Sequence, residues 1–378
     1  MNHYITEIKI EELRHLSDIC IELNRDRRVH LLLTGKNGSG KTTVLRALKK
    51  YLSAIADNKL ENLEKNYKEG ISVDFNETAG LCRAFREGQF ILAFYGADRK
   101  TGIIKQNGAE DVVLDTSYSL EENPGQVLLK YLVHLKTQQA YARNEGDIET
   151  VQMLDQWFER FVSALKVLLD NQSIELRYDY KNYNFEIKED GRNAFGFDQL
   201  SDGYSAAIQI VADLILRMEQ NWLKKGILSS YDAEGIVLID ELETHLHIGL
   251  QKTILPFLTE FFPGIQFIVS THSPYILNSV GNCVIYDLEN KFRMEDMSGY
   301  SAEGIVEGYF EQDSYSDLLL RKVKRYGELV ELKNPTDDER AERAVLLMEM
   351  KQLSGDLARD ARNAFEEIED RRKRNDKV

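Results

Sequence analysis

The chain has 378 residues, of which 43% are hydrophobic and 29% are charged, and its formal net charge at pH 7 is −15. This length allows one large domain or two ordinary ones, each with a substantial core. No apolar run approaches the ~20 residues of a membrane-spanning helix, and the N-terminus lacks a signal pattern. The three scattered cysteines disfavour a disulfide framework or a zinc site, so we expect a cytoplasmic protein. The acidic charge disfavours a protein that coats nucleic acid with its whole surface.

The first hundred residues alternate between strand and helix patterns. Residues 4–10 alternate with period two, as in a half-buried strand, and residues 29–33 form a short apolar run that ends in Thr34-Gly35. A helical pattern follows to about Ala56, and a strand-like segment covers residues 89–95. This order predicts a central strand that delivers the chain to a loop and then a helix.

The middle of the chain is dominated by helical periodicity. Residues 126–143 and 148–169 repeat their apolar side chains at helical spacing, and residues 173–180 and 183–188 alternate like a hairpin. We interpret residues 100–172 as a helical insertion. The alternative interpretation is that these helices simply pack over a sheet.

The α/β pattern then returns. We expect a helix over 203–225, a buried strand over 235–240, a helix over 246–262 and a buried strand over 265–270. Such alternation predicts an α/β fold with a largely parallel or mixed sheet. We therefore divide the chain into an α/β domain of two lobes (1–99 and 173–300), the insertion (100–172) and a charged, helical C-terminal region (301–378).

A complete phosphate-binding loop pattern, GxxxxGK[ST], occupies residues 35–42. Its glycines let successive N–H groups point at phosphate oxygens, and the following helix directs its positive end there. We expect Lys41 to reach the β- and γ-phosphates and the Thr42 hydroxyl to bind Mg²⁺. The alternative, a merely glycine-rich turn, does not explain the Lys-Thr pair. The predicted nucleotide-binding residues are Gly35, Asn37, Gly38, Ser39, Gly40, Lys41, Thr42 and Thr43.

Acidic and imidazole side chains follow the two later buried strands. Asp240 ends one strand, where a carboxylate can bind Mg²⁺, and Glu241 is placed to orient or deprotonate the attacking water. His272 follows the next strand and is expected to hydrogen-bond the γ-phosphate. The predicted catalytic residues are thus Glu241, His272 and Lys41, and the predicted metal ligands are Thr42 and Asp240. The alternatives are a solvated acidic strand end and a structural histidine.

The segment Leu200-Ser201-Asp202-Gly203 precedes the helix predicted over 203–225. Ser201 and the Gly203 backbone make a second helix start that favours anions. A single S-x-G is weak evidence, and its position between the phosphate loop and Asp240 gives it significance.

The order of these motifs resembles the ABC-type ATPase superfamily, including its structural-maintenance-of-chromosomes and Rad50-like branch. The resemblance implies ATP and Mg²⁺ as ligands and a homodimer, or a higher homo-oligomer, with two ATPs at the interface. Ser201 and Gly203 of one copy would then meet the γ-phosphate held by Lys41 of the other. The stretch from Asp240 to His247 resembles the DExExxLH form of ATPases in bacterial anti-phage systems: Septu-like, retron-associated and overcoming-lysogenisation-defect-like.

Two departures from these families shape the functional prediction. The usual glutamine loop is replaced by Gly96-Ala97-Asp98-Arg99, where we expect Asp98 or Arg99 to take its place. The helical residues after about 290 resemble no nuclease domain. We therefore expect an ATPase that regulates a separately encoded nuclease or toxin.

Three other functions remain open from the sequence. A nucleotide-gated scaffold with negligible turnover would use the same residues. A DNA-repair ATPase would bind DNA through basic clusters at 321–325, including Lys322, Lys324 and Arg325, or at 371–374, although both clusters also fit solvated helix faces. A transporter subunit is disfavoured by the motif variants.

Overall fold

The computed structural model describes residues 3–57, 70–99, 111–225, 233–309, 317–332, 335–351 and 368–369. The chain divides into two units, Met1–Tyr300 and Ser301–Val378, and each is described by itself. In the described residues, no helix is long and apolar enough to cross a membrane.

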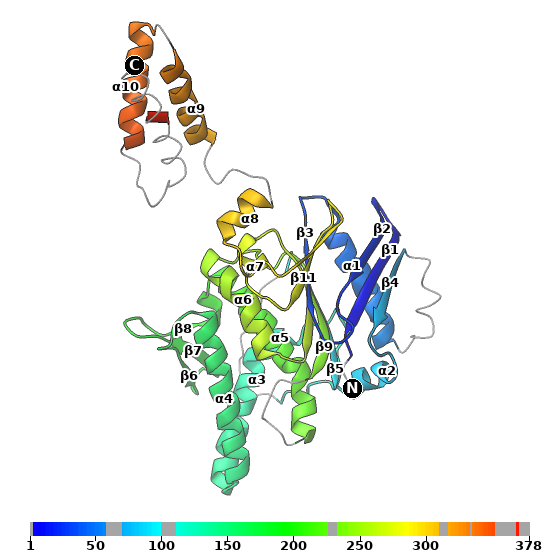
Figure 1. Ribbon diagram of the computed structural model, residues 1–378. Coiled ribbons are helices and arrows are strands. Elements are labelled where there is room, and N and C mark those ends of the chain that lie inside the picture. The colour runs from blue at the N-terminus through cyan, green and yellow to red at the C-terminus, as the bar shows by residue number, and fades with distance from the viewer. Residues whose placement is uncertain are drawn as a thin grey trace. The chain divides into compact units, whose positions relative to one another are not determined.

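The centre of the first unit is a six-stranded sheet (Figure 1). Its strand order is β12-β11-β3-β10-β9-β5, with five parallel strands and the antiparallel edge strand β12. The inner strands are buried on both faces, which explains their continuous apolar runs. The strands are β3 (His30–Thr34), β5 (Phe90–Tyr95), β9 (Glu234–Ile239), β10 (Ile265–Ser270), β11 (Cys283–Asp287) and β12 (Phe292–Glu295). The α/β class and the mixed sheet expected from the sequence are confirmed.

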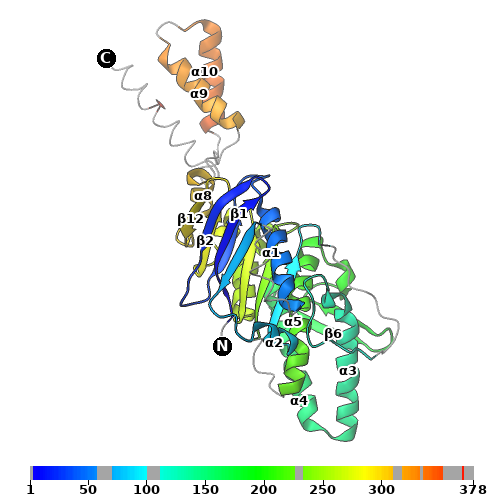
Figure 2. The ribbon, with the colours of Figure 1, turned by 90° about the vertical axis from the view of Figure 1, so that its right-hand side faces the viewer.

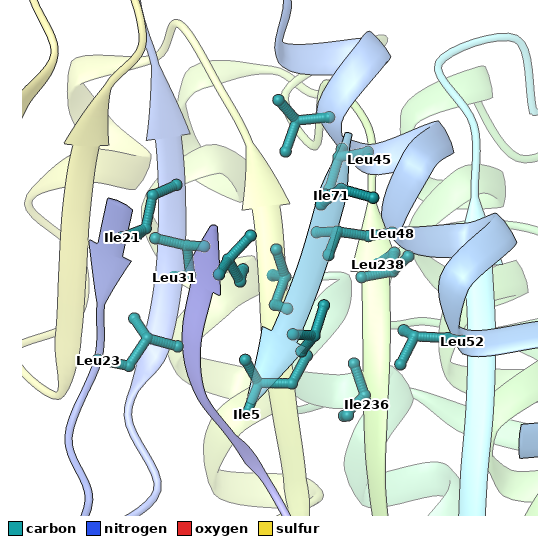
Figure 3. Packing of buried hydrophobic residues seen from close by; sticks show 14 of the residues in the cluster. Ile5, Ile21, Leu23, Leu31, Leu45, Leu48, Leu52, Ile71, Ile236 and Leu238 are labelled. Carbon is teal, nitrogen blue, oxygen red and sulfur yellow. The ribbon is translucent and has the colours of Figure 1, made fainter. Parts of the chain in front are cut away.

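A second, antiparallel sheet packs with α1 (Lys41–Ala56) and α2 (Leu81–Arg86) over one face of the central sheet. Its order is β2-β1-β4, formed by β1 (Ile5–Leu13), β2 (Leu16–Glu22) and β4 (Ile71–Phe75). Leu45, Leu48 and Leu52 of α1 share one core with residues of both sheets (Figure 3). Of these three strands, β1 is predicted by the alternating pattern of residues 4–10, and β2 and β4 were not predicted.

Helices from the middle of the chain cover the other face of the central sheet. They are α3 (Leu128–Glu145), α4 (Ile148–Leu168), α5 (Asp202–Lys225), α6 (Ile248–Phe261) and the short α7 (Pro274–Leu277). The predicted apolar stripe of α4 is buried, including Trp157, Phe161 and Leu165. Figure 2 shows α3 and α4 side by side.

Short elements complete this region. A three-stranded antiparallel sheet is formed by β6 (Glu175–Asp179), β7 (Asn184–Lys188) and β8 (Phe195–Gly196). Two 3-10 turns, η3 (Pro124–Val127) and η4 (Phe197–Gln199), precede α3 and α5 respectively. The predicted hairpin therefore exists as β6 and β7, with a third short strand added.

The second unit contains α8 (Ala302–Gly308), α9 (Asp317–Glu331) and α10 (Asp337–Lys351). Val323, Tyr326 and Leu329 of α9 pack with Leu346 of α10. Two residues of the basic cluster on α9 are paired with acids of α10: Lys322 Nζ lies 2.8 Å from Glu349 Oε2 and Arg325 Nη2 lies 2.8 Å from Glu342 Oε2. The other basic cluster, 371–374, lies outside the described residues.

Candidate active site

The predicted site residues follow neighbouring parallel strands. The loop 35–40 follows β3, His272 follows β10, Glu241 follows β9 and Arg99 follows β5, and these strands are adjacent in the order β3-β10-β9-β5. Parallel strands end at the same edge of a sheet, where open α/β folds bind their ligands. The topology therefore gathers four chain segments that are far apart in the sequence.

The phosphate loop has a conformation that glycine makes possible. Gly35, Gly38 and Gly40 have φ angles of 126°, 86° and 100°, which side chains with a Cβ rarely adopt. A Cβ at Gly35 would lie 2.9 Å from Ser39 Oγ. Asn37 and Gly38 are exposed at the tip of the loop.

Lys41 begins α1 and folds back over the loop. Its Nζ donates to the carbonyl oxygens of Gly35 at 2.8 Å and Lys36 at 3.1 Å. The N-cap residue Gly40 provides no side-chain cap, and α1 has no acidic residue in its first turn. The positive end of this helix and the ammonium group together favour an anion.

Asp240 lies directly after β9 and is the centre of a hydroxyl network. Its Oδ1 accepts hydrogen bonds from Ser270 Oγ at 2.6 Å and from Thr42 Oγ1 at 3.2 Å. Ser270 Oγ in turn accepts from the backbone N–H of Glu241 at 2.8 Å. Ser270 was not predicted as a site residue, although a polar residue at the end of an apolar strand was the available signal.

Glu241 occupies an unusual backbone position. Its φ is 48°, in the left-handed region that residues other than glycine rarely adopt. Its side chain is half-buried, and Oε2 accepts a hydrogen bond from Thr244 Oγ1 at 3.2 Å. The tight turn places this carboxylate beyond the strand end, beside Asp240.

His272 and Glu243 complete the cluster. The backbone N–H of His272 donates to Glu243 Oε1 at 2.5 Å. Burial lowers the pKa of the His272 imidazole and the Lys41 charge lowers it further, opposed by Glu243 and Glu241. The imidazole is therefore neutral at pH 7 and offers one N–H donor. Glu243 was not among the predicted site residues.

The polar atoms of the cluster fit a polyphosphate and a divalent cation. Burial lowers the pKa of Lys41, while Glu241, Glu243, Asp240 and Asp287 oppose this in decreasing order. Ser39 Oγ and Glu243 Oε2 are buried without a hydrogen-bond partner, a situation that folded proteins normally avoid. Hydroxyl and carboxylate oxygens, as on Thr42 and Asp240, are ligands that Mg²⁺ prefers.

Ser201 and Gly203 lie apart from this network. Ser201 is exposed immediately before α5. Gly203 packs against the turn after β9, because a Cβ there would lie 2.4 Å from the carbonyl oxygen of His245. Tyr204 Oη and His247 Nε2 are 2.8 Å apart. The beginning of α5 thus contacts the same turn that carries Glu241.

A family model describes part of this chain. Residues 128–278 match the model described as "AAA domain, putative AbiEii toxin, Type IV TA system". The matched segment includes Ser201, Asp240, Glu241 and His272 and begins after the phosphate loop.

Curated relatives match a larger part of the chain. The retron Ec83 probable ATPase of Escherichia coli is 29% identical over 283 residues, which cover 72% of this chain and 48% of the relative. The Septu protein PtuA of Bacillus mycoides (strain KBAB4) is 25% identical over 370 residues, which cover 89% of this chain and 48% of the relative. The chain thus spans about half the length of these two relatives.

Among solved structures, an Smc head bound to the C-winged helix domain of ScpA matches 78% of this chain and 99% of the Smc head chain. The identity is 13% and the TM-score is 0.42.

Proposed function

We propose that this chain binds ATP with Mg²⁺ and hydrolyses it to ADP and phosphate, a proposal supported by the match of residues 128–278 to a model described as an AAA domain. The observation that carries this proposal is the convergence of Lys41, Asp240, Glu241 and His272 at the ends of three adjacent parallel strands. An ammonium can bind the phosphates, one carboxylate can bind Mg²⁺, a second can orient and deprotonate water, and a neutral imidazole can donate a hydrogen bond, which together support phosphoryl transfer to water.

Each side chain has a separate role in the proposed reaction. Lys41 and the first N–H groups of α1 stabilise the negative charge on the phosphates. Glu241 orients the attacking water and accepts its proton, and the neutral His272 donates a hydrogen bond to the γ-phosphate. Mg²⁺, held by Thr42 and Asp240, would offset the charge that develops on the phosphate oxygens.

We further propose that the site is completed by a second copy of the chain. Ser201 is exposed at the start of the 24-residue helix α5, and Gly203 contacts His245. Neither residue contributes to the network around Lys41 within one chain. In a head-to-tail homodimer, this helix start would face the γ-phosphate bound by the partner copy.

The biological role that we propose is regulation of a separate effector in bacterial anti-phage defence. The support is the similarity to the retron and Septu proteins over most of this chain. ATP-driven closure and hydrolysis-driven release would be the switch. The effector would be a nuclease or toxin that is encoded separately.

Turnover and oligomeric mass of the wild type and of Glu241→Gln, each with and without ATP and Mg²⁺, test the proposal. We expect wild-type hydrolysis, a turnover at least about 10²-fold lower in the variant, and accumulation of the variant as an ATP-bound dimer. Glu186→Gln, on β7, is the matched control. Equal slow turnover and an unchanged mass would overturn the proposal and favour a nucleotide-holding scaffold.

A further inference from the structure

One guanidinium group, that of Arg99, is bonded to three successive carbonyl oxygens of the turn after β9. Arg99 Nη1 donates to the oxygen of Asp240 at 2.9 Å. Its Nη2 donates to the oxygens of Glu241 at 3.0 Å and Leu242 at 3.1 Å. A planar fork of donors is suited to hold several acceptors in fixed directions at once.

The turn needs an external partner because its backbone does not continue the sheet. Glu241 has the φ of 48°, and left-handed backbone costs about 1 kcal/mol or more for a residue other than glycine. Its N–H and that of Leu242 are bonded to Ser270, through Oγ at 2.8 Å and the carbonyl oxygen at 3.2 Å respectively. Ser270 therefore holds the donors of the turn and Arg99 holds its acceptors.

The backbone that leads into Arg99 is itself held in place. β5 pairs with β9 in register Tyr95↔Ile239, and the N–H of Asp240 donates to the Tyr95 carbonyl at 2.8 Å. The Tyr95 hydroxyl donates to Asp213 Oδ2 at 2.6 Å, and Arg217 Nε donates to the same oxygen at 2.7 Å. Arg99 therefore extends from a strand end that is anchored to α5 by the hydrogen bond from Tyr95 to Asp213, a carboxylate that is itself held by the buried ion pair with Arg217.

We propose that Arg99 is a positioning residue for Glu241: its guanidinium locks the carbonyls of residues 240–242, so that the Glu241 carboxylate is presented to the attacking water. This inference rests on the proposed ATP hydrolysis and adds to it a role for a residue outside the phosphate loop. Since the contacts are to backbone oxygens, Arg99 acts on the direction of the Glu241 side chain and not on a metal ion.

Lysine cannot replace this arginine. Its single nitrogen keeps the charge beside Asp240, Glu241 and Glu243 but cannot reach three carbonyls in fixed directions. The charge-preserving Arg99→Lys and the charge-removing Arg99→Met should therefore behave alike. If only the charge mattered, Arg99→Lys would keep its turnover while Arg99→Met would lose it.

The test is a double-mutant cycle with two independent readouts. For Arg99→Met and Arg99→Lys we expect kcat to fall by about 10- to 100-fold, as for a displaced catalytic group. The equilibrium affinity for a fluorescent ATP analogue should change by less than about threefold. In the Glu241→Gln background, Arg99→Met should cost little further turnover, because both changes remove the same function. Arg83→Met, an exposed arginine paired with Glu87, is the control.

Hydrogen exchange of the amides at 240–246 distinguishes a failure of this inference from a failure of the proposed function. Faster exchange there in both Arg99 variants, but not in Arg83→Met, supports positioning even if the wild type turns over no ATP. Unchanged exchange at these amides overturns the inference. The inference is also overturned if the fold-losses in kcat from Arg99→Met and Glu241→Gln multiply in the double variant. A loss of ATP affinity by the same factor as the loss of kcat would overturn it as well.

Discussion

At the scale of the residue, Glu219 is a carboxyl group that ionises near neutral pH. It is buried on α5, where Trp157 Nε1 donates to its Oε2 at 3.1 Å. Burial raises its pKa from 4.5 to about 7, while Tyr131 and Trp157 oppose the shift. The folded protein thus binds this proton more tightly than the unfolded chain. The contribution to stability is complete below pH 4.5 and is lost as the pH rises to 7.

Glu219→Gln should remove this pH dependence. We expect the variant to gain stability relative to the wild type between pH 5 and pH 8, by up to about 3 kcal/mol. Urea unfolding at the two pH values measures it, with the exposed Glu260→Gln on α6 as control. The assignment is wrong if wild type and Glu219→Gln lose stability equally over this interval.

Site residues that belong to a local sequence motif, or that directly follow an apolar strand, can be predicted from the sequence. The loop 35–42 and the acids Asp240 and Glu241 follow apolar strands, and strand ends are readable from hydrophobic runs. Ser270 and Arg99 were not assigned their contacts, because these depend on which strands become neighbours. β5 and β10 flank β9 only in the folded sheet, and no spacing in the chain encodes that order.

At the scale of the element, α5 and the turn after β9 are in direct contact at Gly203. A Cβ at this position would lie 2.4 Å from the His245 carbonyl oxygen. One of the two elements must therefore move to admit even a methyl group.

Gly203→Ala should destabilise the protein by about 1–3 kcal/mol, as overpacking does, although alanine is favoured over glycine in a helix by about 1 kcal/mol. Turnover should fall as well, since the displaced turn carries Glu241. Denaturant midpoints and steady-state hydrolysis measure both effects. Gly299→Ala, where a Cβ would meet nothing within 4 Å, is the control. A neutral or stabilised Gly203→Ala would show that the contact is easily relieved.

Elements with strong hydrophobic periodicity can be predicted from the sequence, but the pairing of the strands cannot. α4 and β10 begin at the expected residues, Ile148 and Ile265. The strand predicted over 235–240 ends one residue earlier, and the helix predicted from Leu246 begins at Ile248, because His247 caps it through Nδ1. In the sheet β2-β1-β4, β4 pairs with β1 across a long sequence separation that no local pattern encodes, whereas β2 follows β1 through a two-residue turn and was missed as a hairpin.

At the scale of the whole molecule, the second unit bears on the DNA-binding alternative. Lys322 and Arg325 are paired with Glu349 and Glu342 of α10. Such exposed pairs contribute little stability, about 0–1 kcal/mol each, but they offset the positive charge that would attract phosphates. The net charge of −15 acts in the same direction.

We therefore expect Lys322→Glu with Arg325→Glu to leave duplex DNA binding unchanged. Fluorescence anisotropy of a labelled duplex over a series of salt concentrations measures it, with Lys252→Glu with Arg293→Glu in the first unit as a charge-matched control. The DNA-repair alternative would be restored by two results seen in the α9 variant alone. Its affinity for DNA would be weaker, and the slope of log affinity against log salt concentration would be shallower by the amount expected for about two lost phosphate contacts.

The folded-back Lys41 has a consequence for the kinetics of ligand capture. Its ammonium group already donates two hydrogen bonds, to the carbonyls of Gly35 and Lys36, which leaves one N–H donor for an arriving phosphate. The loop needs no ordering step before association, and little conformational entropy remains to be lost on binding. Diffusional encounter, rather than rearrangement of the loop, should then limit the rate at which this protein binds a nucleotide.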